Sequence, residues 1–153
     1  MSNDFEIAKS LLAENGKITG LATGRSMWPL LRSNKDNAVI TPVTRPFRKN
    51  DVVLYRKPTT NELVLHRIIK IRGDKLIIRG DNVYYEETGL KPGDIIGILE
   101  GFYKNGKYRE CQNNTLYNIY VLYIRLSYPV RFLVKKALSL CKRIINKLKN
   151  IAK

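Results

Sequence analysis

Three side chains in this sequence could together perform nucleophilic catalysis: Ser26, the single histidine His66, and Asp81. A serine hydroxyl attacks poorly at neutral pH unless a base lies within hydrogen-bond reach, and that base works best when a third group orients it. Histidine suits the role because its unperturbed pKa is about 6.5. Taken singly, each residue also has a structural interpretation, as a loop serine, a buried histidine or a turn aspartate. The catalytic interpretation therefore depends on elements that bring the three together.

The serine lies at a predicted corner between a strand and a short helical turn. Residues 18–23 are typical of a strand, and residues 30–32 of a single helical turn. Between them, residues 24–29 are Gly-Arg-Ser-Met-Trp-Pro. A serine at such a corner is held by the backbone and can direct its hydroxyl into a groove. The sequence therefore favours an accessible Ser26.

A predicted hairpin brings the histidine and the aspartate toward each other. His66 lies within an apolar strand predicted over 63–71, and a glycine-containing turn leads into a second strand over 75–79. Asp81 follows that second strand. Because paired antiparallel strands place the end of one beside the start of the other, Asp81 is expected near His66. A Ser26–His66–Asp81 arrangement is therefore geometrically reasonable.

The rest of the chain predicts a small, mainly β domain with helices at both ends. Apolar residues at helical spacing predict a short helix that Asn15-Gly16 would end. Further strands are predicted over 38–41, 51–55, 94–102 and 107–109. We therefore expect a compact antiparallel domain with coiled strands, barrel-like in form, over residues 1–112, followed by a basic, amphipathic helical extension over residues 113–153.

The C-terminal extension carries much of the positive charge. The formal net charge is +15, and residues 116–153 contain nine basic residues and no acidic ones. After Pro129, apolar residues recur at helical spacing on one face of a cationic helix, and before it tyrosines interleave with apolar residues. This pattern is typical of an element at an anionic membrane surface, although the same stripe could instead pack on the β domain. Nucleic acid is not the expected partner, because no nucleic-acid-reading module accompanies the charge.

Composition argues against several other classes of protein. Two isolated cysteines, Cys111 and Cys141, and a single histidine argue against a metal site and against a disulfide framework, and no cofactor is expected. The N-terminus lacks the basic region of a signal peptide, and no apolar stretch is long enough to cross a bilayer. We therefore expect a cytoplasmic protein, peripheral on the inner membrane surface if the extension binds lipid.

Four motifs follow one another in an order that resembles the type I signal peptidases. They are Gly24-x-Ser26-Met27-x-Pro29, Asn50-Asp51-Val52-Val53, His66-Arg67-Ile68 and Gly80-Asp81-Asn82. The wider clan includes the self-cleaving LexA-type repressors. The resemblance covers residues 24–97, about half of the chain, and ends at Asp94-Ile95-Ile96-Gly97. It implies a mostly antiparallel β fold with coiled strands, in agreement with the strand pattern.

The resemblance also implies catalytic roles. Ser26 would be the nucleophile. His66 stands where most bacterial members have a lysine and would be the base, as in the archaeal, endoplasmic-reticulum and sporulation-type members. Asp81 would orient or electrostatically support His66, and Glu86 or Glu87 is the alternative for this third group. The expected activity is that of a Ser-His serine endopeptidase.

The resemblance further implies two substrate-binding residues. Gly24 stands where some members have a second oxyanion donor, so the Ser26 backbone N–H would form the oxyanion hole, and Met27 would line the floor of the substrate groove. The residues before Ser26 contain neither the transmembrane anchor of typical signal peptidases nor the helix-turn-helix domain of the repressors. The expected substrate is a precursor or leader peptide. The alternative function is a non-catalytic peptide- or membrane-surface-binding module on the same fold.

Overall fold

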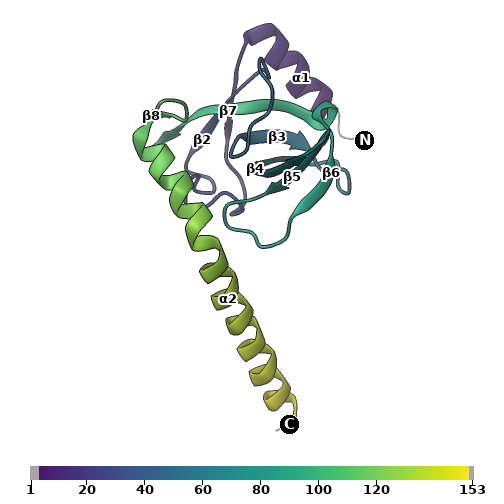
Figure 1. Cartoon of the computed structure of the whole chain (residues 1–153), viewed down its shortest axis with the longest axis vertical. Helices are drawn as coiled ribbons and strands as arrows, with labels where there is room; N and C mark the ends of the chain where they lie inside the picture. Colours follow the sequence, from purple (N-terminus) through teal and green to yellow (C-terminus); the bar gives the residue numbers. More distant parts are fainter. Residues whose placement is uncertain (1–3, 152–153) are drawn as a thin grey trace. The chain divides into compact units, whose positions relative to one another are not determined.

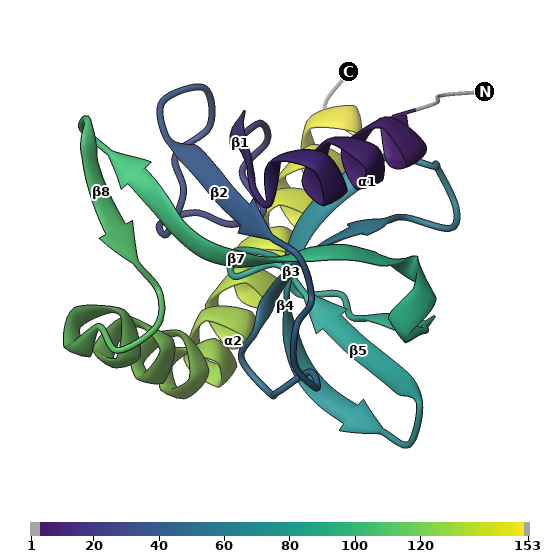
Figure 2. The ribbon, with the colours of Figure 1, turned by 90° about the horizontal axis from the view of Figure 1, so that it is seen from above.

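The computed structural model describes residues 4–151, and the side chains of residues 4–145. The chain forms two compact units, Met1–Tyr117 and Asn118–Lys153. Figure 1 labels most of the elements, and Figure 2 also labels β1. In chain order they are α1 (Asp4–Asn15), β1 (Ile18–Leu21), β2 (Asn37–Thr41), β3 (Val52–Arg56), β4 (Leu63–Arg72), β5 (Lys75–Arg79), β6 (Glu87–Leu90), the 3₁₀ turn η1 (Pro92–Asp94), β7 (Ile95–Lys104), β8 (Lys107–Glu110) and α2 (Thr115–Ile151).

The first unit is built on one open antiparallel sheet. Its strand order is β1-β2-β7-β3-β4-β5-β6, with β8 also pairing to β7. Every pairing is antiparallel. The predicted mainly β, antiparallel fold with a short N-terminal helix and a C-terminal helix is therefore confirmed. Within the described residues the outermost strands β1 and β6 do not pair, so the sheet does not close into a barrel.

Irregular pairings bend the strands of this sheet. The register shifts between Val39 and Ile40 where β2 meets β7, and between Ile68 and Lys70 where β4 meets β5. A third shift occurs where β3 meets β7. Such irregularities increase the local twist and bend the strand. Figure 2 shows the twisted sheet, in which β7 continues from the core to its partner β8.

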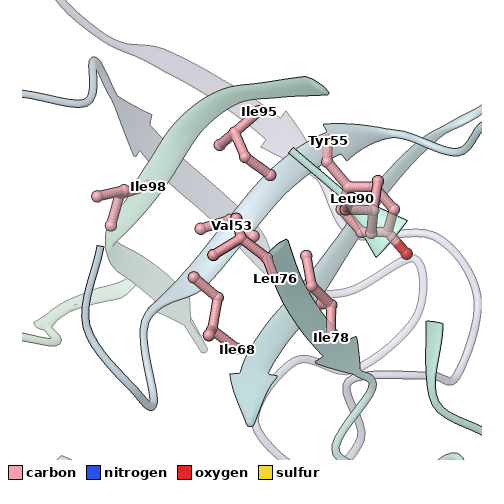
Figure 3. Packing of buried hydrophobic residues seen from close by; sticks show 8 residues of the cluster. All are labelled: Val53, Tyr55, Ile68, Leu76, Ile78, Leu90, Ile95 and Ile98. Carbon is pink, nitrogen blue, oxygen red and sulfur yellow. The ribbon is translucent and has the colours of Figure 1, made fainter. Parts of the chain in front are cut away.

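One apolar core fixes the strands that surround the histidine. It is formed by side chains from β3 to β7, none of them more than 6% exposed, which meet as shown in Figure 3. They are Val53, Tyr55, Ile68, Leu76, Ile78, Leu90, Ile95 and Ile98. Burying each large apolar side chain contributes about 1.5–3 kcal/mol. The core therefore holds β3 in a defined register beside β4, the strand that carries His66.

Helix α1 covers part of this sheet. Its buried residues are Phe5, Ala8 and Leu12, three and four positions apart and so on one face of the helix. Leu12 packs closely against Gly97 of β7, where a Cβ would come within 2.9 Å of Cδ2 of Leu12. The glycine therefore allows the helix to approach the sheet.

Strand β6 is not recognisable from the sequence pattern. It has four residues, has β5 as its single partner among the described strands, and contains Gly89 at a positive φ of 85°. Only Leu90 of this strand is buried. A strand this short offers no alternation to detect, and its pairing with β5 decides its conformation. The strand matters because it begins at Glu87.

Helix α2 is one continuous helix of 37 residues that includes Pro129. The sequence pattern suggests instead that the proline divides this segment. Proline removes a backbone donor from a helix interior. Arg131 Nη2 donates to the carbonyl oxygen of Ile124 at 3.3 Å, which gives a carbonyl in the turn before the proline a further partner. No described helix has an apolar stretch that would cross a membrane.

Candidate active site

His66 lies on β4 with two polar groups beside Nδ1 of its ring. The side chain is buried, and the residue pairs with Val53 of β3. Nδ1 lies 3.1 Å from the hydroxyl oxygen of Tyr55 and 3.3 Å from Oε1 of Glu87. Tyr55 is two residues from Val53 and therefore projects from the same face of the sheet as His66. The strand register thus brings a hydroxyl to the ring, and β6 brings a carboxylate.

Burial is the main influence on the protonation of His66. It lowers the pKa of the imidazole below the ordinary value of 6.5, whereas the charge of Glu87 raises this pKa, that of Lys57 lowers it and that of Asp81 raises it. Burial prevails, so the ring is neutral at pH 7. A carboxylate beside Nδ1 favours the tautomer that carries its proton there. Nε2 then keeps its lone pair, as a general base requires.

The second ring nitrogen of His66 borders the space beside Gly80. Nε2 is buried and has no hydrogen-bond partner among the described residues. A Cβ placed on Gly80 would lie 2.9 Å from Nε2 and 2.8 Å from the carbonyl oxygen of Ser26, and closer still to Val83. Nε2 of His66 and the backbone carbonyl of Ser26 therefore border the same small space, which only glycine leaves open.

Hydrogen bonds from the turn after β5 hold the Ser26 loop. The backbone N–H of Asn82 donates to the Ser26 carbonyl oxygen at 2.7 Å, and Nδ2 of Asn82 donates to the Arg25 carbonyl oxygen at 3.1 Å. Gly24 has a φ of 76°, in the left-handed region that favours glycine. Ser26 is half-buried and Met27 is buried. The first and last predicted motifs are therefore joined through the backbone.

Asp81, the predicted third group, is bound by Arg67. Nε and Nη2 of Arg67 donate to the two carboxylate oxygens of Asp81, each at 2.7 Å. Both residues are buried. Paired, hydrogen-bonded charges are tolerated at such depth, whereas one left alone is not. The charge of Asp81 still raises the pKa of His66, although its two oxygens accept from Arg67.

The two glutamates considered as alternatives lie in different surroundings. Glu87 is the acid beside Nδ1 of His66, and its side chain is 13% exposed. Glu86 lies 3.5 Å from Nη1 of Arg79, and its side chain is 48% exposed. Glu87 is therefore the carboxylate whose position allows it to orient the imidazole.

Arg67 connects the predicted motifs with one another. Its Nη1 donates to the backbone carbonyl of Asn50 at 2.9 Å and to the hydroxyl of Tyr117 at 3.1 Å. Burial opposes the charge of the guanidinium, but the neighbouring Asp81 outweighs it and raises the pKa of Arg67. The charged side chain thus ties together the second, third and fourth motifs and the first turn of α2.

A groove of about 510 Å³ opens beside Ser26. Strand β1, the start of β4 and the Ser26 loop line it, and Gly24 and Met27 are among its lining residues. Strand β1 pairs only with β2, and β4 pairs with β5 only from Arg67 onward. Within the described residues, β1 and residues 63–66 therefore each have one edge without a strand partner. Such edges can accept an extended peptide.

Some residues of the site could not be recognised from the sequence. Tyr55 carries no signal, because alternation marks it only as a core residue of a strand. Arg67 and Asn82 lie within the motifs, but their partners depend on contacts between distant segments.

No group of three or more potential ligands among His, Cys, Asp and Glu gathers in the described part of the chain to hold a metal ion. The free cysteines, Cys111 and Cys141, lie in the two different units.

Comparison with models of known protein families yields no match, and comparison with curated proteins yields no significant match either.

Proposed function

We propose that this protein is a serine endopeptidase in which Ser26 is the nucleophile and His66 the general base. The observation that carries the proposal is the buried Nε2 of His66, which has no partner among the described residues and borders the same space as the Ser26 backbone. A buried polar atom without a partner is costly and rarely kept without a use. A proton taken from the serine hydroxyl would satisfy it.

The proposed reaction needs no group beyond the chain and water. As Oγ of Ser26 bonds to the scissile carbonyl carbon, its proton passes to Nε2 of His66. The tetrahedral intermediate then collapses, the C–N bond breaks, and His66 returns the proton to the leaving amine. Water attacks the acyl carbon and gives a proton to His66. The bond between that carbon and Oγ of Ser26 then breaks, His66 returns the proton to Oγ, and the carboxyl product leaves. The backbone N–H of Ser26 would stabilise the negative oxygen in both stages.

Glu87 and Tyr55 support the base in this mechanism. The carboxylate beside Nδ1 keeps the proton there, leaves Nε2 available, and stabilises the imidazolium that forms during the reaction. The Tyr55 hydroxyl adds a contact on the same side of the ring. Asp81 acts indirectly. Its carboxylate binds Arg67, and the next residue, Asn82, holds the Ser26 loop through its backbone N–H. We thus assign Glu87 as the third catalytic group and Asp81 as a positioning residue.

The groove suits an extended, apolar peptide. A substrate strand lying between β1 and the start of β4 would form backbone hydrogen bonds to their unpaired edges. The groove lining is largely apolar, and among the described residues that line it Glu62 alone has an ionisable side chain. The resemblance to type I signal peptidases of the histidine form supports the same reading and suggests a precursor or leader peptide as the substrate.

Labelling with a fluorophosphonate, which acylates activated serines, tests the proposal directly. Peptide mapping by mass spectrometry should find the label on Ser26, and labelling should be lost in Ser26→Ala and in His66→Ala. Ser10→Ala is the matched control, because Ser10 is an exposed serine on α1 and its removal should leave the rate unchanged.

Failure to label Ser26 at any pH would refute the peptidase mechanism. The alternative, a non-catalytic peptide-binding module, would then be examined by measuring whether apolar peptides bind the groove without being cut. Cleavage of a peptide by Ser26→Ala at the wild-type rate would refute the mechanism in the same way.

A further inference from the structure

The second unit is a helix with an apolar stripe exposed along its length. Along α2 this stripe repeats at intervals of four and three residues, and each of its large members is at least half exposed. They are Ile119, Tyr123, Leu126, Val130, Leu133, Leu140 and Ile144. Exposed apolar patches of this extent mark an interaction surface.

Cationic residues occupy the opposite side of the same helix. At about 100° per residue, the stripe and its apolar neighbours cover an arc of roughly 160°, and the basic residues fall on the remainder. The described ones are Arg125, Arg131, Lys135, Lys136, Lys142 and Arg143. Residues 116–153 contain no acidic side chain. One face is therefore apolar, and all the charged side chains described on the other face are basic.

We propose that this stripe binds the surface of an anionic membrane, with α2 lying in the plane of the headgroups. In this orientation the apolar stripe would be buried at the boundary between the headgroups and the acyl chains. The lysine and arginine side chains would reach the lipid phosphates, so both faces of the helix would find suitable partners. The helix has 37 residues, about 55 Å of length, but no segment suited to cross the bilayer. The function inferred here is independent of the chemistry at Ser26.

Charge distinguishes lipid from a second copy of the chain as the occupant. The four-three spacing would also fit a two-helix coiled coil, but such pairs are stabilised by opposite charges beside the seam. In α2 the charged side chains that flank the apolar stripe are all lysine or arginine, so two copies of the helix would repel each other. The apolar arc is also wider than a two-helix seam requires. An anionic surface satisfies both features.

Vesicle flotation of the full chain tests the proposal. Binding is expected to vesicles of phosphatidylcholine mixed with phosphatidylglycerol, to be much weaker with phosphatidylcholine alone, and to decrease with salt because the attraction is screened. The double variant Leu126→Gln, Leu133→Gln should have an affinity for the anionic vesicles at least about tenfold lower, because it removes two apolar contacts from the stripe.

The matched control introduces glutamine at two positions of α2 that lie outside the apolar stripe. Asn118→Gln with Ser139→Gln alters two exposed polar positions and should leave binding unchanged. Circular dichroism establishes that each variant retains its fold. The proposal is overturned if neither vesicle type binds the protein, if both bind it equally, or if the two variants behave alike. A dimer in solution that Leu126→Gln and Leu133→Gln dissociate would identify a second copy as the occupant instead.

Discussion

Oε1 of Glu87 lies 3.3 Å from Nδ1 of His66, although strand β5 separates their two strands in the sheet. The contact is possible because β5 pairs with β4 only from Arg67 onward. The space beside the histidine is therefore left for a side chain from β6. This placement distinguishes Glu87 from Asp81, whose carboxylate is bound by Arg67.

Glu87→Gln should slow the labelling of Ser26 and move its pH midpoint to lower pH. The carboxylate raises the pKa of His66, so its removal leaves burial less opposed. Loss of the group that orients the base should reduce the plateau rate by about tenfold or more. The measurement is the labelling rate as a function of pH. Glu86→Gln is the control, and a shift of the same size in that variant would contradict the assignment.

The labelling rate of the wild type should reach its plateau at a pH below that expected for an exposed histidine. Burial lowers the pKa of His66 below 6.5, so the reactive neutral ring persists into mildly acidic solution.

The same shift in the pKa of His66 affects the stability of the fold. The unfolded chain takes up a proton near pH 6.5 and the folded chain only at lower pH, so the His66 contribution is complete above pH 6.5 and decreases as the pH falls. Denaturant unfolding of wild type and His66→Gln at several pH values measures this loss. An equal pH dependence in both would contradict it.

Asp81→Asn should act mainly on stability. The change leaves the buried guanidinium of Arg67 without its charge partner, which typically costs about 3–5 kcal/mol. Urea unfolding measures the effect, and Asp74→Asn in the exposed hairpin turn is the control, expected to change stability by less than about 0.5 kcal/mol. A stable Asp81→Asn protein with a large shift in the labelling midpoint would instead make Asp81 the orienting acid.

Gly80→Ala should disrupt the site more than the fold. The new Cβ would overlap the space that His66 and Ser26 share, so labelling should be lost while stability decreases by about 1–3 kcal/mol. Gly93→Ala is the matched control, because a Cβ there meets nothing within 4 Å. Labelling of Gly80→Ala at the wild-type rate would show that catalysis does not require His66 and the Ser26 loop to share the space beside Gly80.

Tyr117→Phe should weaken the first unit modestly. It removes the hydroxyl that accepts from Nη1 of Arg67 at 3.1 Å, while the Asn50 carbonyl continues to accept from the same atom. A loss of about 0.5–1.5 kcal/mol is expected in urea unfolding. Tyr123→Phe, which changes an exposed tyrosine of the same helix, should have no measurable effect. Equal losses in both variants would exclude a specific contribution from the Arg67 contact.

Local sequence was enough to predict most of the elements and the order of the motifs. Alternation over 63–71 and the glycine turn after it predict the hairpin that carries His66, and these features depend only on neighbours along the chain. The same is true of the apolar stripe of α2, which follows from helical periodicity. The polar pattern of β6 gives no such signal, so the strand and its Glu87 could not be placed.

Tertiary structure alone selected the partners within the site. The sequence favours Asp81 as the third group and leaves Glu86 and Glu87 as alternatives, because all three follow the same strand within a few residues. Sheet pairing distinguishes them: it directs Asp81 to Arg67, Glu86 to Arg79 and Glu87 to His66. Such choices depend on register and on contacts between segments distant in the chain, whereas periodicity records only which face of an element is buried.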